Sequence, residues 1–188
     1  LARTAPLARR LPEGRVSVFL DYDGTLTPIV ERPEDAVLSE PTRALLRDLA
    51  GRCPVAVISG RDLADVRRMV GLETLWYAGS HGFDIAGPGG EHMEHEAARQ
   101  ILPELEAAAG EAEARLAGIS GVHLERKGYA LAVHYRQAAP EDEERIRSIL
   151  GEVAAEHRGL RRRAGKKILE LQPDLEWDKG RALQWLRE

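Results

Sequence analysis

The sequence predicts an α/β protein in which a Rossmann-like core with a parallel sheet carries an inserted α+β domain. Two observations support this. Up to residue 86, apolar β-rich runs alternate with amphipathic helical segments, which is typical of a parallel sheet. From 87 to 172 the pattern instead predicts pairs of strands separated by helices. We therefore expect a leader at 1–14, a first part of the core at 15–86, the insert at 87–172 and a return to the core at 173–188.

The composition is that of a folded protein with no strong surface charge. Of the 188 residues 43% are hydrophobic and 31% charged, and the formal net charge is −4. This balance argues against a general binder of nucleic acid or membrane surfaces, and the apolar runs are shorter than the roughly 18 residues of a membrane helix. The single cysteine, Cys53, excludes an internal disulfide framework, so we expect a reducing, cytoplasmic location. The sequence carries no signal of oligomeric state.

Each element of the core follows from a local pattern. Residues 16–20 (VSVFL) predict a buried strand, and 41–50 predict a helix with a proline at its start. The run 54–60 (PVAVISG) predicts a second strand, 62–70 a second helix and 75–82 (LWYAGSHG) a third strand. Strand, helix, strand, helix, strand is the order of a parallel sheet with crossover connections.

The insert has its own order of elements. Residues 97–117 are rich in Ala and Glu at helical spacing, with Pro103 either starting or interrupting that helix. The runs VHLERKG and YALAVHYR, on either side of Gly128, predict an antiparallel hairpin. Residues 140–157 predict a second amphipathic helix, and 161–173 another hairpin. We thus expect helix, two strands, helix, two strands.

The candidate site centres on two carboxylates, Asp21 and Asp23, directly after the first strand in the run DYDGT. In an open α/β sheet, ligands bind beyond the carboxyl ends of the strands. One carboxylate could attack an electrophile while the other transfers protons, and Gly24 lets the chain turn and present N–H groups to an anion. The alternative is an ordinary turn, because Asp and Gly are common turn residues. The apolar VFL before these residues and TLT after them favour the site.

The run VFLDYDGTLTPI resembles the first motif of the haloacid dehalogenase superfamily of phosphatases. More narrowly, the chain is similar to the trehalose-6-phosphate phosphatases from about residue 15 to its last residue. The resemblance includes, in order, VISGR, GSHG, ERKGYALAVHYR, ILELQP and WDKG. It implies a hydrolase core that uses Mg²⁺, a cap domain formed by the insert, and a small-molecule sugar phosphate as substrate.

The resemblance also implies roles for residues of the core. Asp21 would be the nucleophile that forms an aspartyl-phosphate, and Asp23 would act as general acid and then as general base. The same two residues would hold Mg²⁺. The phosphate-binding residues would be Gly24, Ser59, Gly60 and Lys179. Taken alone, a Ser-Gly pair after a strand is an ordinary turn, and a lysine at a helix start is usually solvated.

The resemblance assigns sugar recognition to the insert. Glu125 and Lys127 are two apart in a predicted strand, so both face one side, and Glu170 lies in another predicted strand. Carboxylates accept hydrogen bonds from sugar hydroxyls, and lysine donates them. The alternative is an ion pair on a solvated face. Further substrate-binding residues would be Arg61, His81, Gly82 and Arg136, whereas His134 could be a strand histidine that only fills space.

Several alternatives stay open. The substrate could be another sugar phosphate, such as glucosylglycerol or sucrose phosphate, or the chain could bind a phosphosugar without hydrolysing it. The basic run 161–167 could bind an anionic polymer, although charged hairpin rims are common, and we expect no nucleic acid and no membrane partner. The family's acidic loop of the type GDDxTDE is absent from these residues. We therefore expect an incomplete core at the C-terminus, either because the chain is a fragment or because its metal site lacks ligands.

Overall fold

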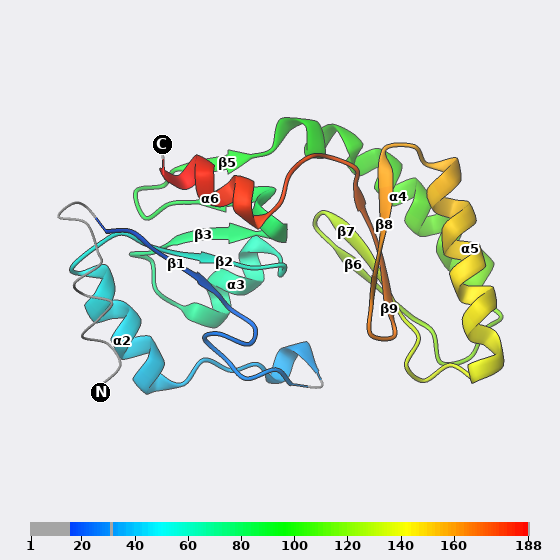
Figure 1. Cartoon of the computed structure of the whole chain (residues 1–188), viewed down its shortest axis with the longest axis horizontal. Helices are drawn as coiled ribbons and strands as arrows, with labels where there is room; N and C mark the ends of the chain where they lie inside the picture. Colours follow the sequence, from blue (N-terminus) through cyan, green and yellow to red (C-terminus); the bar gives the residue numbers. More distant parts are fainter. Residues whose placement is uncertain (1–15, 31, 188) are drawn as a thin grey trace.

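The computed structural model describes residues 16–30 and 32–187, which form two lobes (Figure 1). One lobe is built on a five-stranded sheet and the other on a four-stranded sheet. The expected leader at 1–14 lies outside the described residues. The chain crosses between the lobes twice, from β5 (His92–Glu94) to α4 (Glu96–Leu116) and from β9 (Ile168–Pro173) to α6 (Lys179–Arg187). Within the described ranges no helix is both long enough and apolar enough to cross a bilayer.

The first lobe contains the parallel sheet that the sequence predicts. Its strand order is β1-β2-β3-β4-β5. The three parallel strands are β1 (Val18–Asp21), β2 (Val55–Ile58) and β3 (Trp76–Gly79). The helices that connect them are α2 (Glu40–Ala50), which follows the short helix η1 (Pro33–Asp35), and α3 (Leu63–Val70). These five elements of the core confirm the predicted order of strands and helices.

The antiparallel strands at the end of this sheet shift the expected boundary between the core and the insert. Residues 87–172 are expected in the insert, but β5 pairs with β4 (Asp84–Ala86) in the first sheet. The turn at 87–90 therefore belongs to the core lobe, and the chain passes to the second lobe only at α4. The pattern did not reveal these strands because three residues are too few to show a period-2 alternation.

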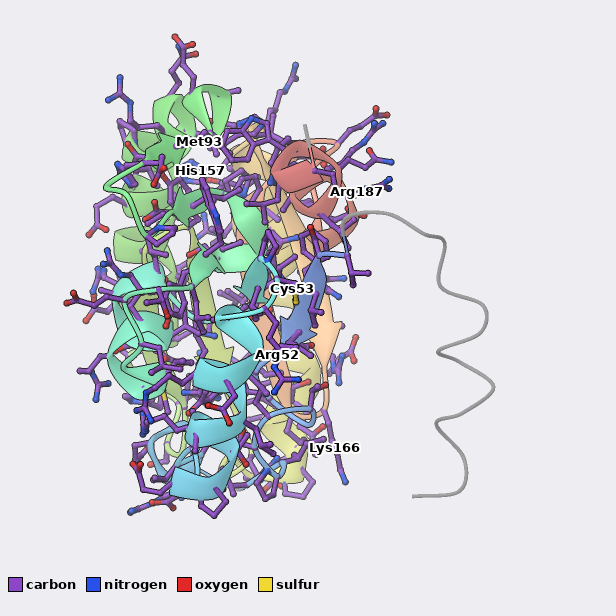
Figure 2. The ribbon with its side chains drawn as sticks, turned by 90° about the vertical axis from the view of Figure 1, so that its left-hand side faces the viewer. Arg52, Cys53, Met93, His157, Lys166 and Arg187 are labelled. Carbon is purple, nitrogen blue, oxygen red and sulfur yellow. The ribbon has the colours of Figure 1, made fainter. Side chains whose placement is uncertain are left out.

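Helices cover both faces of the first sheet. On one face, α2 and α3 pack over a buried cluster that includes Leu46, Val57 and Val66. On the other face, Ala182 of α6 packs with Ile58. Figure 2 views these layers from the side, with Cys53 directly after α2 and Arg187 at the end of α6. Because both faces are covered, the loops beyond the strand ends are where this sheet can present polar side chains to a ligand.

The second lobe has the predicted order of helix, two strands, helix, two strands. Its antiparallel sheet has the order β6-β7-β9-β8. The strands not yet bounded are β6 (His123–Lys127), β7 (Ala130–His134) and β8 (Leu160–Gly165). Helix α5 (Glu143–Glu156) follows the short helix η3 (Pro140–Asp142), and α4 continues through Pro103.

The two faces of the second sheet differ in character. Leu131 and Val133 of β7 are at most 1% exposed and pack with Leu105 of α4 and Leu150 of α5. Because side chains alternate along a strand, Ala132 between them lies on the opposite face. That face carries polar side chains and looks onto the first lobe.

Candidate active site

The two predicted carboxylates lie at the carboxyl end of β1. Tyr22, between them, is fully buried and donates its hydroxyl to the carbonyl of Ala36 at 2.7 Å. Because Tyr22 is anchored in the core, the side chains of Asp21 and Asp23 point away from it, and each is 43% exposed. Gly24 follows with a φ of +79° and donates its N–H to the Thr27 carbonyl at 2.9 Å, which closes the turn.

Lys179 meets Asp21 from the other end of the chain. Its Nζ donates to Asp21 Oδ2 at 2.7 Å across 158 residues of sequence. The start of α6 that carries this lysine is fixed by Asp178, whose Oδ1 accepts the Arg181 N–H at 2.9 Å. A cation thus lies directly beside the carboxylate that the sequence analysis assigned as nucleophile.

Gly82 packs against the first turn of α6. It belongs to the short helix η2 (Ser80–Gly82), is buried, and has a φ of +97°. A Cβ at this position would lie 2.2 Å from the Cβ of Ala182, so only glycine permits this approach of α6. Gly82 is absent from the residues that line the cleft described below.

Arg61 holds the second carboxylate with both arms of its guanidinium. Its Nε donates to Asp23 Oδ2 at 2.9 Å and its Nη2 to Oδ1 at 2.7 Å. This charge-assisted pair raises the pKa of Arg61. The arginine side chain is only 15% exposed, and its Cζ lies 5.4 Å from the centre of the Tyr22 ring. Both oxygens of Asp23 are therefore acceptors in this conformation.

The loops after β2 and β3 bring Ser59, Gly60 and His81 together. Ser59 is fully buried, and its Oγ accepts the N–H of Arg61 at 3.1 Å. Ser80 and His81 both have positive φ, 48° and 60°, which is uncommon for residues with side chains. Their N–H groups donate to the carbonyls of Arg61 and Ser59, at 2.7 and 2.8 Å, and so hold this conformation. The imidazole then lies so close to Gly60 that a Cβ there would be 2.8 Å from Cε1.

The surroundings of His81 are electropositive. Burial lowers the pKa of its imidazole most, and the charges of Lys179 and Arg163 lower it further. Near neutral pH the imidazole is therefore uncharged, and the positive charge at this point comes from the lysine and the arginine. Such a site favours an anion.

The opposite wall of the cleft is the polar face of the second sheet. Glu125, Ala132 and Glu170 stand in register on β6, β7 and β9. Because Ala132 is small, Lys127 reaches across it, and its Nζ lies 3.1 Å from Glu170 Oε1 and 3.8 Å from Glu125 Oε2. His134 joins the group, with its Nε2 2.9 Å from Glu125 Oε2.

A cleft of about 750 Å³ separates the two walls, a volume within the usual range for small-molecule sites. The core contributes Asp23, Gly60, Arg61 and His81, among others. The insert contributes Glu125, Lys127, His134, Arg163 and Glu170, among others. A neighbouring cavity of about 330 Å³ is lined by Lys179 and shares His81 and Arg163 with the cleft.

Some predicted residues do not reach the cleft, and some that reach it were missed. Arg136 is exposed beyond the end of β7 and is not among the lining residues. Its neighbour His134 lines the cleft instead. Arg163 was seen only as part of a basic run, although it pairs in register with Glu170. Asp62 also lines the cleft, and the sequence offers no signal for it beyond its position after Arg61.

The basic run does not form one surface. Arg162 donates to the carbonyl of Arg147 at 2.9 Å, and Lys167 pairs with Glu143. Arg163 lines the cleft. Because these side chains have different partners and directions, they do not present a continuous strip of charge.

The residues near Asp21 fit a sparsely ligated metal ion. In the described ranges no three His, Cys, Asp or Glu side chains gather as a metal cluster. The oxygen donors at this end of β1 are the carboxylates of Asp21 and Asp23, which are paired here with Lys179 and Arg61. This donor set suits Mg²⁺, which often keeps several waters and takes only one or two protein carboxylates plus substrate phosphate.

The fold of this chain is found in other solved structures. The chain is similar in fold to a haloacid dehalogenase-like hydrolase from Bacteroides thetaiotaomicron, with a TM-score of 0.64 at 15% identity, covering 92% of this chain and 76% of that one. The family model of the trehalose-phosphatases matches residues 19–188, and the chain belongs to this family.

Individual relatives agree with this assignment. The chain is 46% identical over 172 residues to a trehalose-phosphate phosphatase of Mycobacterium marinum, covering 92% of this chain and 44% of that protein. It also matches the crystal structure of a trehalose-6-phosphate phosphatase related protein, with a TM-score of 0.80, 25% identity, and coverage of 92% of this chain and 73% of that one. The chain thus spans less than half the length of the curated relative.

Proposed function

We propose that this chain forms the reacting core and sugar-selecting cap of a Mg²⁺-dependent phosphatase that hydrolyses trehalose 6-phosphate to trehalose and phosphate. One observation carries the proposal. The carboxylate of Asp23, paired with Arg61, lies on one wall of the cleft, and a Glu-Lys-Glu group suited to sugar hydroxyls lies on the other. Next to Asp23, the carboxylate of Asp21 is paired with Lys179, which lines the neighbouring cavity. A cytoplasmic location agrees with the free thiol of Cys53.

In the first step, a carboxylate oxygen of Asp21 attacks the phosphorus, and the bond from phosphorus to the sugar oxygen breaks. The carboxyl of Asp23 gives a proton to the leaving oxygen. Because both oxygens of Asp23 accept from Arg61 in this conformation, the guanidinium must first exchange this carboxylate for the substrate. Positioning and charge neutralisation supply most of the catalysis in phosphoryl transfer.

In the second step, water attacks the phosphorus of the aspartyl-phosphate. Asp23 takes a proton from that water, the bond from phosphorus to Asp21 breaks, and inorganic phosphate leaves. Lys179 stabilises the negative charge in both steps, because its Nζ already lies 2.7 Å from Asp21. Ser59 and Gly60 form the loop that would receive the phosphate oxygens.

The carboxylate of Asp21 and the carbonyl of Asp23 would hold Mg²⁺ together with water and the phosphate. When bound, the ion supplies neutralisation of charge on the transferring group. Sugar selection falls to the second lobe, which we propose as the cap. There Glu125 and Glu170 accept from hydroxyls, and Lys127 donates to them.

The decisive experiment measures phosphate release from trehalose 6-phosphate by this chain, with Mg²⁺ and with EDTA. We expect release with Mg²⁺ and none with EDTA. The variant Asp21→Asn should lose at least about a thousandfold in kcat, because it lacks the nucleophile. The matched control is Asp48→Asn, since Asp48 is exposed on α2 away from the cleft.

Besides a failure of the wild-type chain to release phosphate, two outcomes would contradict the proposal. One is an Asp21→Asn variant as fast as the wild type, which would exclude the aspartyl-phosphate route. The other is faster release from sucrose 6-phosphate or glucosylglycerol phosphate, which would move the substrate to another sugar.

A further inference from the structure

Asp62 stands at the start of α3 but does not cap it. Its side chain makes no hydrogen bond to the first turn of the helix. Ser39 at the start of α2 behaves in the ordinary way, accepting the N–H of Thr42 at 3.3 Å. Instead, Oδ1 of Asp62 accepts the N–H of Gly128 at 2.9 Å and the hydroxyl of Ser80 at 3.0 Å. The carboxylate is thus directed at the second lobe.

This hydrogen bond joins the two walls of the cleft at an informative place. Asp62 directly follows Arg61, which holds Asp23. Gly128 directly follows Lys127, which belongs to the proposed sugar-binding group. Figure 1 shows the tip of the β6–β7 hairpin directed at the end of the first sheet. The hydrogen bond between Asp62 and Gly128 therefore connects the residue next to Arg61 with the residue next to Lys127.

Tyr129, also in the β6–β7 turn, contacts the first lobe outside the cleft. Tyr129 packs on Phe83, with ring centres 5.5 Å apart, and its hydroxyl donates to Glu94 Oε1 at 2.5 Å. Glu94 ends β5, where the chain crosses between the lobes, so this contact belongs to the hinge. Asp62 and not Tyr129 lines the cleft. The contacts of Tyr129 with Phe83 and Glu94 join the lobes where the chain crosses between them. The hydrogen bond of Asp62 with Gly128 lies at the cleft, where it bears on the distance between the two walls.

We propose that Asp62 is a positioning residue that sets the spacing between the phosphate-reacting wall and the sugar-binding wall. It holds the β6–β7 turn on the core, so that Glu125 and Lys127 reach the sugar while the phosphate lies at Asp21. The consequence for catalysis rests on the proposed function, but the closure of the lobes does not. A substrate that spans both walls needs this spacing, and a small phosphate ester does not.

The chemistry of the contact gives graded variants. Asp62→Ala removes the acceptor. Asp62→Asn keeps an oxygen that can accept the Gly128 N–H, without the strength that charge adds. Gly128→Ala leaves the donor but adds a Cβ 3.3 Å from Asp62 Oδ1, and its backbone has no positive φ that would strain alanine.

The first test measures the closure of the lobes without any enzymatic assay. Spin labels replace the exposed Glu73 after α3 and Lys166 on the β8–β9 turn, in a Cys53→Ala background so that only two thiols remain. Electron–electron resonance distances should form one narrow distribution when Asp62 is present. Asp62→Ala should broaden and lengthen it, with Gly128→Ala intermediate and Asp62→Asn close to wild type. An unchanged distribution in Asp62→Ala would overturn the proposal.

The second test compares two phosphate esters. Asp62→Ala should lower kcat/KM for trehalose 6-phosphate about ten- to a hundredfold, the usual range for losing a hydrogen bond to a charged group. Hydrolysis of p-nitrophenyl phosphate should stay within about twofold, because that ester does not reach the second wall. Ser39→Ala is the matched control, which should lower the stability of α2 and alter neither rate.

A parallel fall of both rates in Asp62→Ala would mean that the residue serves the core alone and would refute the positioning role. If the wild-type chain hydrolyses neither ester, the proposed function fails. The resonance distances then decide the role of Asp62 independently.

Discussion

The two walls of the cleft are built in different ways. The core wall and the reacting groups next to it come from four separate segments, which carry Asp21 with Asp23, Arg61, His81 and Lys179. The geometry of the core wall depends on backbone conformation, with positive φ at Ser80 and His81. The wall of the insert is one face of a regular antiparallel sheet, where Glu125, Ala132 and Glu170 are in register.

This difference separates reaction from recognition. A side chain on a regular sheet can be exchanged while the ladder and its buried face remain intact. The core wall has no such freedom, because each loop holds the next through backbone hydrogen bonds such as those from Ser80 and His81. Changes to the reacting residues of the core should therefore affect every substrate. Changes on the wall of the insert, or at Asp62, which positions that wall, should affect only substrates that reach it.

Among variants that keep the nucleophile Asp21, the largest effect is expected for Lys179→Ala. Removing the ammonium from Asp21 takes away stabilisation of the transferring charge, and kcat should fall about a hundred- to a thousandfold for every phosphate ester. Rates with trehalose 6-phosphate and p-nitrophenyl phosphate measure this. Lys166→Ala, exposed on the β8–β9 turn (Figure 2), is the matched control. A loss confined to the sugar ester would break the comparison between the walls.

A smaller and selective effect is expected for Glu170→Gln. It keeps the shape of the side chain but removes the charge that holds Lys127, so kcat/KM for trehalose 6-phosphate should fall about tenfold. The rate with p-nitrophenyl phosphate should not change. Glu144→Gln, on the exposed side of α5, should alter neither rate. Equal losses with both esters would show that this wall serves the reaction as well.

The smallest effect is a pH dependence of stability. The pKa of His81 lies below its ordinary 6.5, chiefly because of burial, so below pH 6.5 the unfolded chain binds the proton more readily. The neutral imidazole of His81 is therefore favoured in the folded chain, and the stability that depends on it is fully present above pH 6.5. That stability is lost as the pH falls toward the pKa of His81 in the folded chain.

The variant His81→Asn isolates this term, because asparagine tolerates a positive φ. Urea unfolding at pH 7.5 and 5.5 should show a larger loss in the wild type than in the variant, by less than about 1 kcal/mol. Equal losses in the two proteins would mean that the imidazole titrates in the folded chain as it does in water.

Local patterns predicted the elements better than the contacts between them. The alternation in VHLERKG and YALAVHYR predicted the hairpin of β6 and β7, whose buried face carries Leu131 and Val133, at most 1% exposed. The same alternation placed Glu125 and Lys127 on one side, and both line the cleft. Arg136 follows the end of β7, is exposed and does not line the cleft, so its role in substrate binding stays a prediction.

The sequence could not show contacts that depend on tertiary packing. The pair Asp62 and Gly128 is separated by 66 residues, and nothing in either local pattern links them. Asp21 and Lys179 were associated only through a family resemblance. Arg163 was within reach of prediction, because a two-residue turn at 166–167 implies a hairpin register that pairs it with Glu170.

Because Gly82 lies so close to Ala182, a substitution at this glycine can change catalysis through the position of α6. Any side chain at this position would push against α6 and lift the start of that helix, which carries Lys179. Such a variant should lose activity with every ester, although Gly82 does not line the cleft. A mutational survey judged by rates alone would score this glycine as a contact residue, although the displacement of α6 would account for the loss as well.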